Sequence, residues 1–277
     1  MEHQDSYPQV LRQFEALVSA ATAVSQGAAG RRSETSRHYW SSVLYTRLCV
    51  NSVSLLFLLP RNRFARVLFE HWDFAAVASL ARNVFETYLA FYYLCVESVD
   101  EDEWNCRWNV FNLHDCLSRR RLFERFGYDT EQVLSFDKDA EDVRGRLRLN
   151  RYFRGLSEKK QKLLLKGRNA YLITQDEIIN RTNMDANYFR AMYEFLSTQI
   201  HGFPMSFYRT GDKNRGRGVE NEVERGYICW AVEFTGSLVQ RATKEMIELF
   251  PGSDKKVSPL GRRAVYSDQR RTNGGTK

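Results

Sequence analysis

The segment from Ala75 to Leu94 constrains the fold most, because it is apolar on nearly every side of a helix. It reads AAVASLARNVFETYLAFYYL, and its only charged side chains are Arg82 and Glu86. A helix without a polar face normally lies at the centre of a bundle. Asp73 precedes the segment in the position of an N-cap, so we predict one long helix over residues 74–96.

Apolar residues recur at spacings of three and four in several other segments, which predicts amphipathic helices. These segments are residues 8–26, 33–60, 104–127, 185–202 and 220–250. Residues 130–170 are poorly periodic, and no strand pattern longer than a few residues is present. The chain has only five prolines and sixteen glycines, too few for a turn-rich β-sandwich. We therefore predict an all-α protein, a single bundle of seven or eight helices in residues 1–252.

Four consecutive acidic residues, Asp100 to Glu103, are open to two interpretations: an acidic site or the start of a helix. Asp100 and Glu103 have the spacing of a capping box, and acidic side chains stabilise a helix N-terminus. The helix interpretation is favoured.

The sequence carries no signal for export, membrane insertion or metal binding. Residues 1–10 include Glu2 and Asp5 and no apolar run, unlike a signal peptide. The longest uncharged apolar stretch, residues 48–60, is shorter than the roughly 20 residues of a membrane span. The five cysteines are scattered and have no histidine at metal-ligand spacing. We expect a cytoplasmic protein with reduced thiols, no membrane contact, no metal and no cofactor.

The net charge of +7 is unevenly distributed along the chain. Residues 144–168 contain ten basic residues and one acidic residue, a local net charge of +9. Residues 253–277 contain seven basic and two acidic residues, a net charge of +5, so the remainder is acidic at −7. We predict an acidic helical body, a basic insertion over 144–168 and a disordered basic tail over 253–277.

The basic insertion is the candidate nucleic-acid interface. Arginines outnumber lysines 31 to 10 in the chain, and the planar guanidinium suits bidentate phosphate contacts. Tyr152 lies among the arginines, where an aromatic ring can stack on an unpaired base. The alternative is a solvated insertion whose charge keeps the protein soluble. The candidate binding residues are Arg144, Arg146, Arg148, Arg151, Tyr152, Arg154, Lys159 and Lys160.

A second candidate site combines two stripes of polar residues. Arg82 and Glu86 are four residues apart on one helix face, and Tyr193, Ser197 and His201 share one stripe of another helix. Buried charges must be paired, so the first pair is either a structural clamp or part of a site that holds an anion. His201 is either a last-turn histidine, capped by Gly202, or an acid–base group. If the two helices pack together, Arg82, Glu86, Ser197 and His201 meet.

The segments LARNVFETYLAFYYL and YEFLSTQIHG resemble a family of all-helical bacterial proteins of unknown function. Its members show an Arg and a Glu four residues apart, followed far downstream by Tyr-x3-Ser-x3-His-Gly or His-Ala. Arg82 and Glu86 match the first motif, and Tyr193, Ser197 and His201 match the second. The resemblance implies a shared helical layout over about residues 70–210.

More distantly, the fold is similar to the HEPN superfamily of nucleotide-binding proteins and ribonucleases, whose ribonucleases use Arg-x4–6-His. The sequence contains this spacing, but the residue after the arginine is never the family's Asn, Asp or His. The pairs are Arg66/His71, Arg107/His114, and Arg31 and Arg32 with His38.

Three functions are left open. The first is a non-enzymatic module that binds RNA, another polyanion or a nucleotide through residues 144–168, in bacterial defence or stress. The second is a metal-independent ribonuclease, a toxin or phage-defence effector. In it His201 is the general base, Arg82 stabilises the charge on the phosphate, and Glu86 orients either His201 or Arg82. Ser197 completes its candidate catalytic set, and Tyr193 would contact the ligand with Arg82 and His201. The third is a protein-interaction or homodimer scaffold.

Overall fold

The computed structural model describes residues 6–65, 69–201, 204–208, 210 and 215–267. This part of the chain contains twelve α-helices and one π-helical turn, and no strand, which confirms the all-α class. The helices outnumber the expected seven or eight because several are shorter than two turns, too short to leave a periodic pattern. The chain divides into two compact units: unit 1 (residues 1–96 and 182–277) and unit 2 (Glu97–Arg181).

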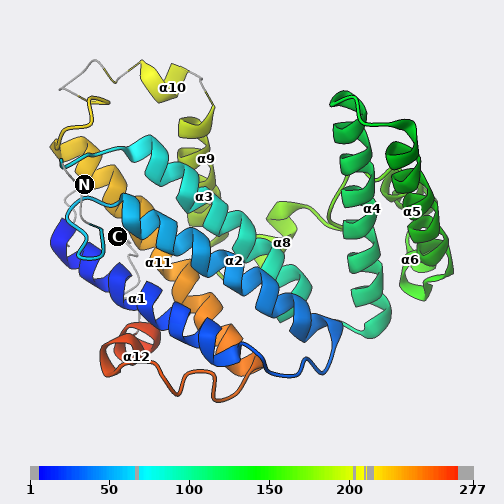
Figure 1. The fold of residues 1–277 in the computed structure, drawn as a ribbon, viewed down its shortest axis with the longest axis horizontal. Coiled ribbons are helices and arrows are strands. Elements are labelled where there is room, and N and C mark those ends of the chain that lie inside the picture. Colours follow the sequence, from blue (N-terminus) through cyan, green and yellow to red (C-terminus); the bar gives the residue numbers. More distant parts are fainter. Residues whose placement is uncertain (1–5, 66–68, 202–203, 209, 211–214, 268–277) are drawn as a thin grey trace, which may run out of the picture. The chain divides into compact units, whose positions relative to one another are not determined.

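Unit 1 is built around the apolar helix, as the sequence predicts. Helix α3 (Phe74–Phe91) continues as the π-helical turn η1 (Tyr92–Val96) and packs against α2 (Ser36–Leu58), α9 (Ala186–Ile200) and α11 (Glu222–Leu249). Helix α1 (Tyr7–Ala28) lies along α2 and α11, and the short α10 (Pro204–Phe207) follows α9 (Figure 1). The core residues Ala78, Ala81, Val84 and Tyr88 of α3 are fully buried, which confirms its central position.

The predicted helix starts are confirmed by side-chain caps. The carboxylates of Asp73 and Asp100 accept hydrogen bonds from backbone amides three residues later, at 3.0 and 2.7 Å. Asp185 accepts from the amides of Asn187 and Tyr188 at the start of α9. The acidic run is therefore the first turn of α4 (Glu101–Arg125), as the favoured interpretation states.

The prediction of a single bundle with a basic insertion over residues 144–168 is corrected by unit 2, which is a compact unit of its own. Its helices are α4, α5 (Thr130–Leu149), α6 (Arg151–Gly155), α7 (Glu158–Leu164) and α8 (Gln175–Arg181). Helices α4 and α5 lie side by side (Figure 1) and share a core of their own. That core includes Cys106, Val110, Leu113, Ala140, Val143, Leu147, Phe153 and Leu164. The basic block is thus a structural part of unit 2. Helix α5 escaped detection because it buries only Ala140, Val143 and Leu147, all in its second half. Helices α6 and α7 each bury one residue, too few to give a period.

The expected disordered tail is also corrected for the residues that the structure describes. Helix α12 (Pro259–Tyr266) packs on α1 and α11 and buries Val265. The side-chain amide of Gln240 donates hydrogen bonds to the backbone carbonyls of Ala264, Val265 and Ser267, and these bonds link the end of α12 to α11. Four of the tail's seven basic residues lie within residues 253–267; residues 268–277 lie outside the described part.

Helix α2 is longer than the uncharged apolar stretch over residues 48–60 and includes most of it. Among the described residues it is the one helix whose length and composition would suffice to cross a membrane. Core helices of soluble proteins share this composition, and α2 packs against α1, α3 and α11.

Candidate functional site

The Arg82 side chain joins α3 to α9. Its guanidinium donates hydrogen bonds to the Ser197 hydroxyl and, at 2.6 Å, to the Tyr193 hydroxyl. It also donates to the Glu86 carboxylate at 3.3 Å. The guanidinium carbon lies 4.2 Å from the centre of the Tyr193 ring, a cation–π contact. The structure therefore brings together four of the five predicted residues: Arg82, Glu86, Tyr193 and Ser197.

Packing between the two helices positions this cluster, which we call the Arg82 cluster. The Phe85 ring of α3 lies 5.7 Å from Phe189 and 5.6 Å from Tyr193 of α9. Residues 189, 193 and 197 are one helical turn apart, so this face of α9 carries its apolar anchor and its hydroxyl groups in one row.

The Arg82 cluster lies at the edge of the core, and the expectation of a buried pair is corrected. The Arg82 side chain is 18% exposed and that of Glu86 is 43% exposed. Helix α9 covers only part of this side of α3, so the carboxylate keeps contact with water. The Arg82 guanidinium binds the hydroxyl groups of Tyr193 and Ser197 and thereby links α3 to α9.

His201 has a different environment from the other four residues. Helix α9 ends at Ile200, and His201 is the C-cap with extended backbone angles, φ −99° and ψ 135°. Its side chain is exposed. The expectation of a histidine inside the last helical turn is thus corrected by one residue, and Gly202, its expected cap, lies outside the described residues.

The arginines and histidines of the alternative Arg-x4–6-His pairs lie in different environments. Arg107 is 1% exposed, and its guanidinium is bound to Glu97 and Glu103 at 2.6 and 2.5 Å. His114 lies 3.2 Å from the Gly167 carbonyl through Nδ1. Arg31 and Arg32 are exposed, and Arg66 lies outside the described residues.

Unit 2 carries a groove of about 600 Å³ in which basic side chains gather. Five cationic residues and one carboxylate line it, together with Leu117. We call this the basic groove; its charged residues are Arg120 and Arg121 of α4, Arg144 and Asp137 of α5, and Lys166 and Arg168 after α7.

The cations of the basic groove differ in their partners. Arg120 is paired with Asp137 at 2.7 Å, which raises its pKa further, and Arg144 is paired with Glu141 at 2.5 Å. Arg144 also donates to the Leu165 carbonyl at 3.0 Å, so it fixes the end of α7. The side chains of Lys166 and Arg168 are exposed and make no hydrogen bond or ion pair with the residues that the structure describes.

Gly167 positions these two unpaired cations. Its backbone has φ +62°, a conformation that residues other than glycine rarely adopt. A Cβ atom there would lie 2.4 Å from the Leu117 side chain. The close approach sets the chain against α4, and the residues on either side, Lys166 and Arg168, extend into the groove.

The other predicted nucleic-acid residues lie outside the basic groove. Tyr152 is half-buried and packs against the core of unit 2, which leaves less of its ring for stacking on a base. Lys160 is half-buried, whereas Arg148, Arg151, Arg154 and Lys159 are exposed. Sequence reasoning missed Arg120 and Arg121. Their signal was the run Arg119–Arg121, which was counted within a net-acidic remainder.

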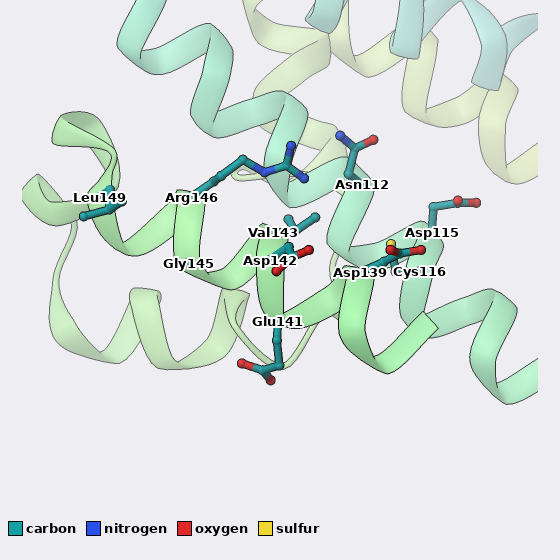
Figure 2. Close-up of a pocket in the computed structure, with 10 residues that line it drawn as sticks. All are labelled: Asn112, Asp115, Cys116, Asp139, Glu141, Asp142, Val143, Gly145, Arg146 and Leu149. Atoms are coloured by element: carbon teal, nitrogen blue, oxygen red, sulfur yellow. The ribbon is translucent and has the colours of Figure 1, made fainter. Parts of the chain in front are cut away.

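Arg146 lines a second pocket of unit 2, of about 620 Å³ and opposite charge. Figure 2 shows its residues, which come from α4 and α5 and include Asp115, Asp139, Glu141 and Asp142. Burial raises the pKa of the Cys116 thiol at its wall, helped by Asp139 and Asp115. No group of three potential ligands among the described residues could hold a metal ion.

These features define an all-α protein with two helical units, which carry the Arg82 cluster and the basic groove respectively. Its residues 38–218 match the model of DUF5677, a family of unknown function, and the chain belongs to this family. The match confirms the resemblance to a family of unknown function and includes the Arg82 cluster and all of unit 2. No curated protein and no solved structure matches the chain.

Proposed function

We propose that this protein is a cytoplasmic nucleic-acid-binding module that holds the phosphate backbone in the basic groove of unit 2. The observation that carries the proposal is the gathering of five cationic side chains around one groove with a single carboxylate. Helices α4 and α5 and the loop after α7 supply these residues.

The division between paired and unpaired cations supports this function. Arg120 and Arg144 are held by carboxylates and shape the groove. Lys166 and Arg168 have no acidic partner among the described residues, and binding a phosphate would require no ion pair of theirs to break. Each phosphate neutralised releases condensed counterions, which makes such binding strongly salt-dependent.

The lining of the groove favours contacts with the backbone over contacts with bases. It contains Leu117 and charged residues but no aromatic ring on which a base could stack. We therefore expect affinity that depends on charge density and little on sequence.

A salt titration tests the proposal. Fluorescence anisotropy would measure the binding of a labelled single-stranded RNA and a labelled DNA duplex at rising salt. Neutralising Lys166 and Arg168 to Gln removes two phosphate contacts. It should lower the slope of log K against log salt by about 1.5. The matched control is Lys255→Gln with Lys256→Gln, two exposed lysines of unit 1. Binding that is absent, or reduced equally by both pairs, would overturn the proposal.

A metal-independent ribonuclease of bacterial defence is a second candidate. It is favoured by the partial exposure of Arg82 beside Glu86 and the hydroxyl groups of Tyr193 and Ser197. In this function Arg82 stabilises the phosphorane charge and His201, one turn beyond Ser197, is the general base. Expression should then be toxic, and His201→Ala should abolish both toxicity and RNA cleavage. Equal growth with wild type and variant, and no cleavage, would exclude it.

A further inference from the structure

Helix α2 has two apolar faces, and only one of them is covered by unit 1. The covered face buries Tyr45, Leu48, Leu55 and Leu56 against the neighbouring helices. The opposite face leaves five large apolar side chains between 42% and 57% exposed: Tyr39, Val43, Val50, Phe57 and Leu58. Tyr39 and Val43 share the apolar period of this helix, but they lie outside the core.

The open face follows a heptad repeat. Val43, Val50 and Phe57 are seven residues apart and occupy a positions, and Tyr39, Thr46 and Val53 occupy the d positions. This a/d seam runs for most of the helix, and the buried residues of α2 occupy the c, f and g positions instead. A 3.5-residue apolar period is the pattern by which one helix packs along another. A contiguous apolar face of this kind on a monomer marks an interaction site.

We propose that α2 packs along α2 of a second copy of this chain. An antiparallel pair with its two-fold axis between Thr46 and Val50 would set Val43 of each copy against Val53 of the other, and Phe57 against Tyr39. Such an interface is isologous: the same patch serves both copies. The exposed Arg47 occupies an e position, which flanks the seam.

The exposed area suits a weak dimer. From the exposed fractions, the five apolar side chains leave on the order of 400 Å² open per copy. Two copies therefore bring together about 800 Å² before the d-position Thr46 and the flanking Arg47 and Ser54 are counted, and specific interfaces begin at about 1,000 Å². We therefore expect a dissociation constant in the micromolar range and a dimer fraction that rises with protein concentration.

A heptad seam distinguishes a helix partner from a lipid surface. Membrane insertion requires apolar area but no 3.5-residue register. In α2, five of the six a and d positions from Tyr39 to Phe57 are apolar, and the exception is Thr46. This inference does not depend on the basic groove, which belongs to unit 2.

Sedimentation equilibrium of the full chain over a wide concentration range tests the proposal. The wild type should show a monomer–dimer equilibrium, and Val50→Glu should raise the dissociation constant by at least about tenfold. Val219→Glu is the matched control, because Val219 is 53% exposed and lies outside α2. Circular dichroism would check that both variants stay folded, and Val50→Thr, which keeps the side-chain shape, replaces Val50→Glu if that variant unfolds.

Three results would overturn the proposal. One is a wild type that remains monomeric at the highest concentration. Another is a dimer that Val50→Glu does not weaken. A third is a monomer that floats with phospholipid vesicles, with flotation lost in Val50→Glu, which would assign the seam to a lipid surface.

Discussion

Glu97 and Arg181, the first and last residues of unit 2, form an ion pair of 2.8 Å. Behind this pair lies Arg107, which is 1% exposed and binds the second oxygen of Glu97 as well as Glu103. Burial opposes ionisation of Glu97, yet the two guanidinium groups hold its pKa below its usual range. The point where the chain enters unit 2 is thus tied to the point where it leaves.

Removing Arg107 should therefore destabilise unit 2 strongly. Arg107→Leu leaves the carboxylates of Glu97 and Glu103 without their buried partner, and breaking a buried pair costs about 3–5 kcal/mol. Arg119→Leu is the control, since its pair with Asp115 is exposed and an exposed pair contributes about 0.5 kcal/mol. Amide hydrogen exchange of α4 and α5 would measure the loss of stability in each of the two variants. Equal protection in the two variants would contradict the assignment.

Glu245 should make the stability of unit 1 depend on pH. Burial raises the pKa of this carboxyl to about 7, and the hydrogen bonds from Arg241 and Tyr88 offset only part of the effect. The folded state then binds a proton that the unfolded chain, with a pKa near 4.5, has released. The stabilisation is complete below pH 4.5 and is lost as the pH rises through 7.

The size of this effect is on the order of 3 kcal/mol between the two limits, at 1.36 kcal/mol for each pKa unit. Urea unfolding of the wild type and of Glu245→Gln from pH 5 to pH 8 would measure it. The wild type should lose stability relative to the variant as the pH rises. Parallel curves for the two proteins would show that Glu245 titrates normally.

The Arg82 cluster should contribute to stability whether or not it has a catalytic role. Arg82→Gln removes the hydrogen bonds that join α3 to α9 and should cost about 1–3 kcal/mol. Arg82→Lys should recover little, because a lysine lacks the planar fork that reaches both Tyr193 and Ser197. Arg12→Gln, an exposed position on α1, is the control and should change stability by less than about 0.5 kcal/mol. Thermal unfolding gives the comparison.

Gly167→Ala should disturb the basic groove from within. A Cβ atom at φ +62° would clash with Leu117, and the strain should cost about 1–3 kcal/mol and displace Lys166 and Arg168. Gly145→Ala is the matched control: Gly145 lies inside α5 with no atom within 4 Å of an added Cβ, so alanine should stabilise the helix by up to about 1 kcal/mol. Gly167→Ala should lower both the stability against unfolding and the affinity for RNA, whereas Gly145→Ala should lower neither.

Local signals in the sequence predicted much of this structure. The caps Asp73, Asp100 and Asp185 depend on residues three positions away, and the central place of α3 follows from its uniform apolarity. The meeting of Arg82 with Ser197 could also be predicted, because each lies on a stripe that a single helix fixes. It required only that α3 and α9 pack together.

The remaining features depend on contacts between distant segments. The basic groove joins Arg120 to Lys166 across 46 positions, and no local pattern records that α5 and the loop at Gly167 both pack on α4. The same holds for α2, whose two apolar faces look alike in the sequence until unit 1 covers only one. The sequence by itself determined where helices begin and which residues share a face, because those depend on neighbours within a few turns. The tertiary structure alone decided which faces stay open and which charges gather, because both depend on which helices exclude water from one another.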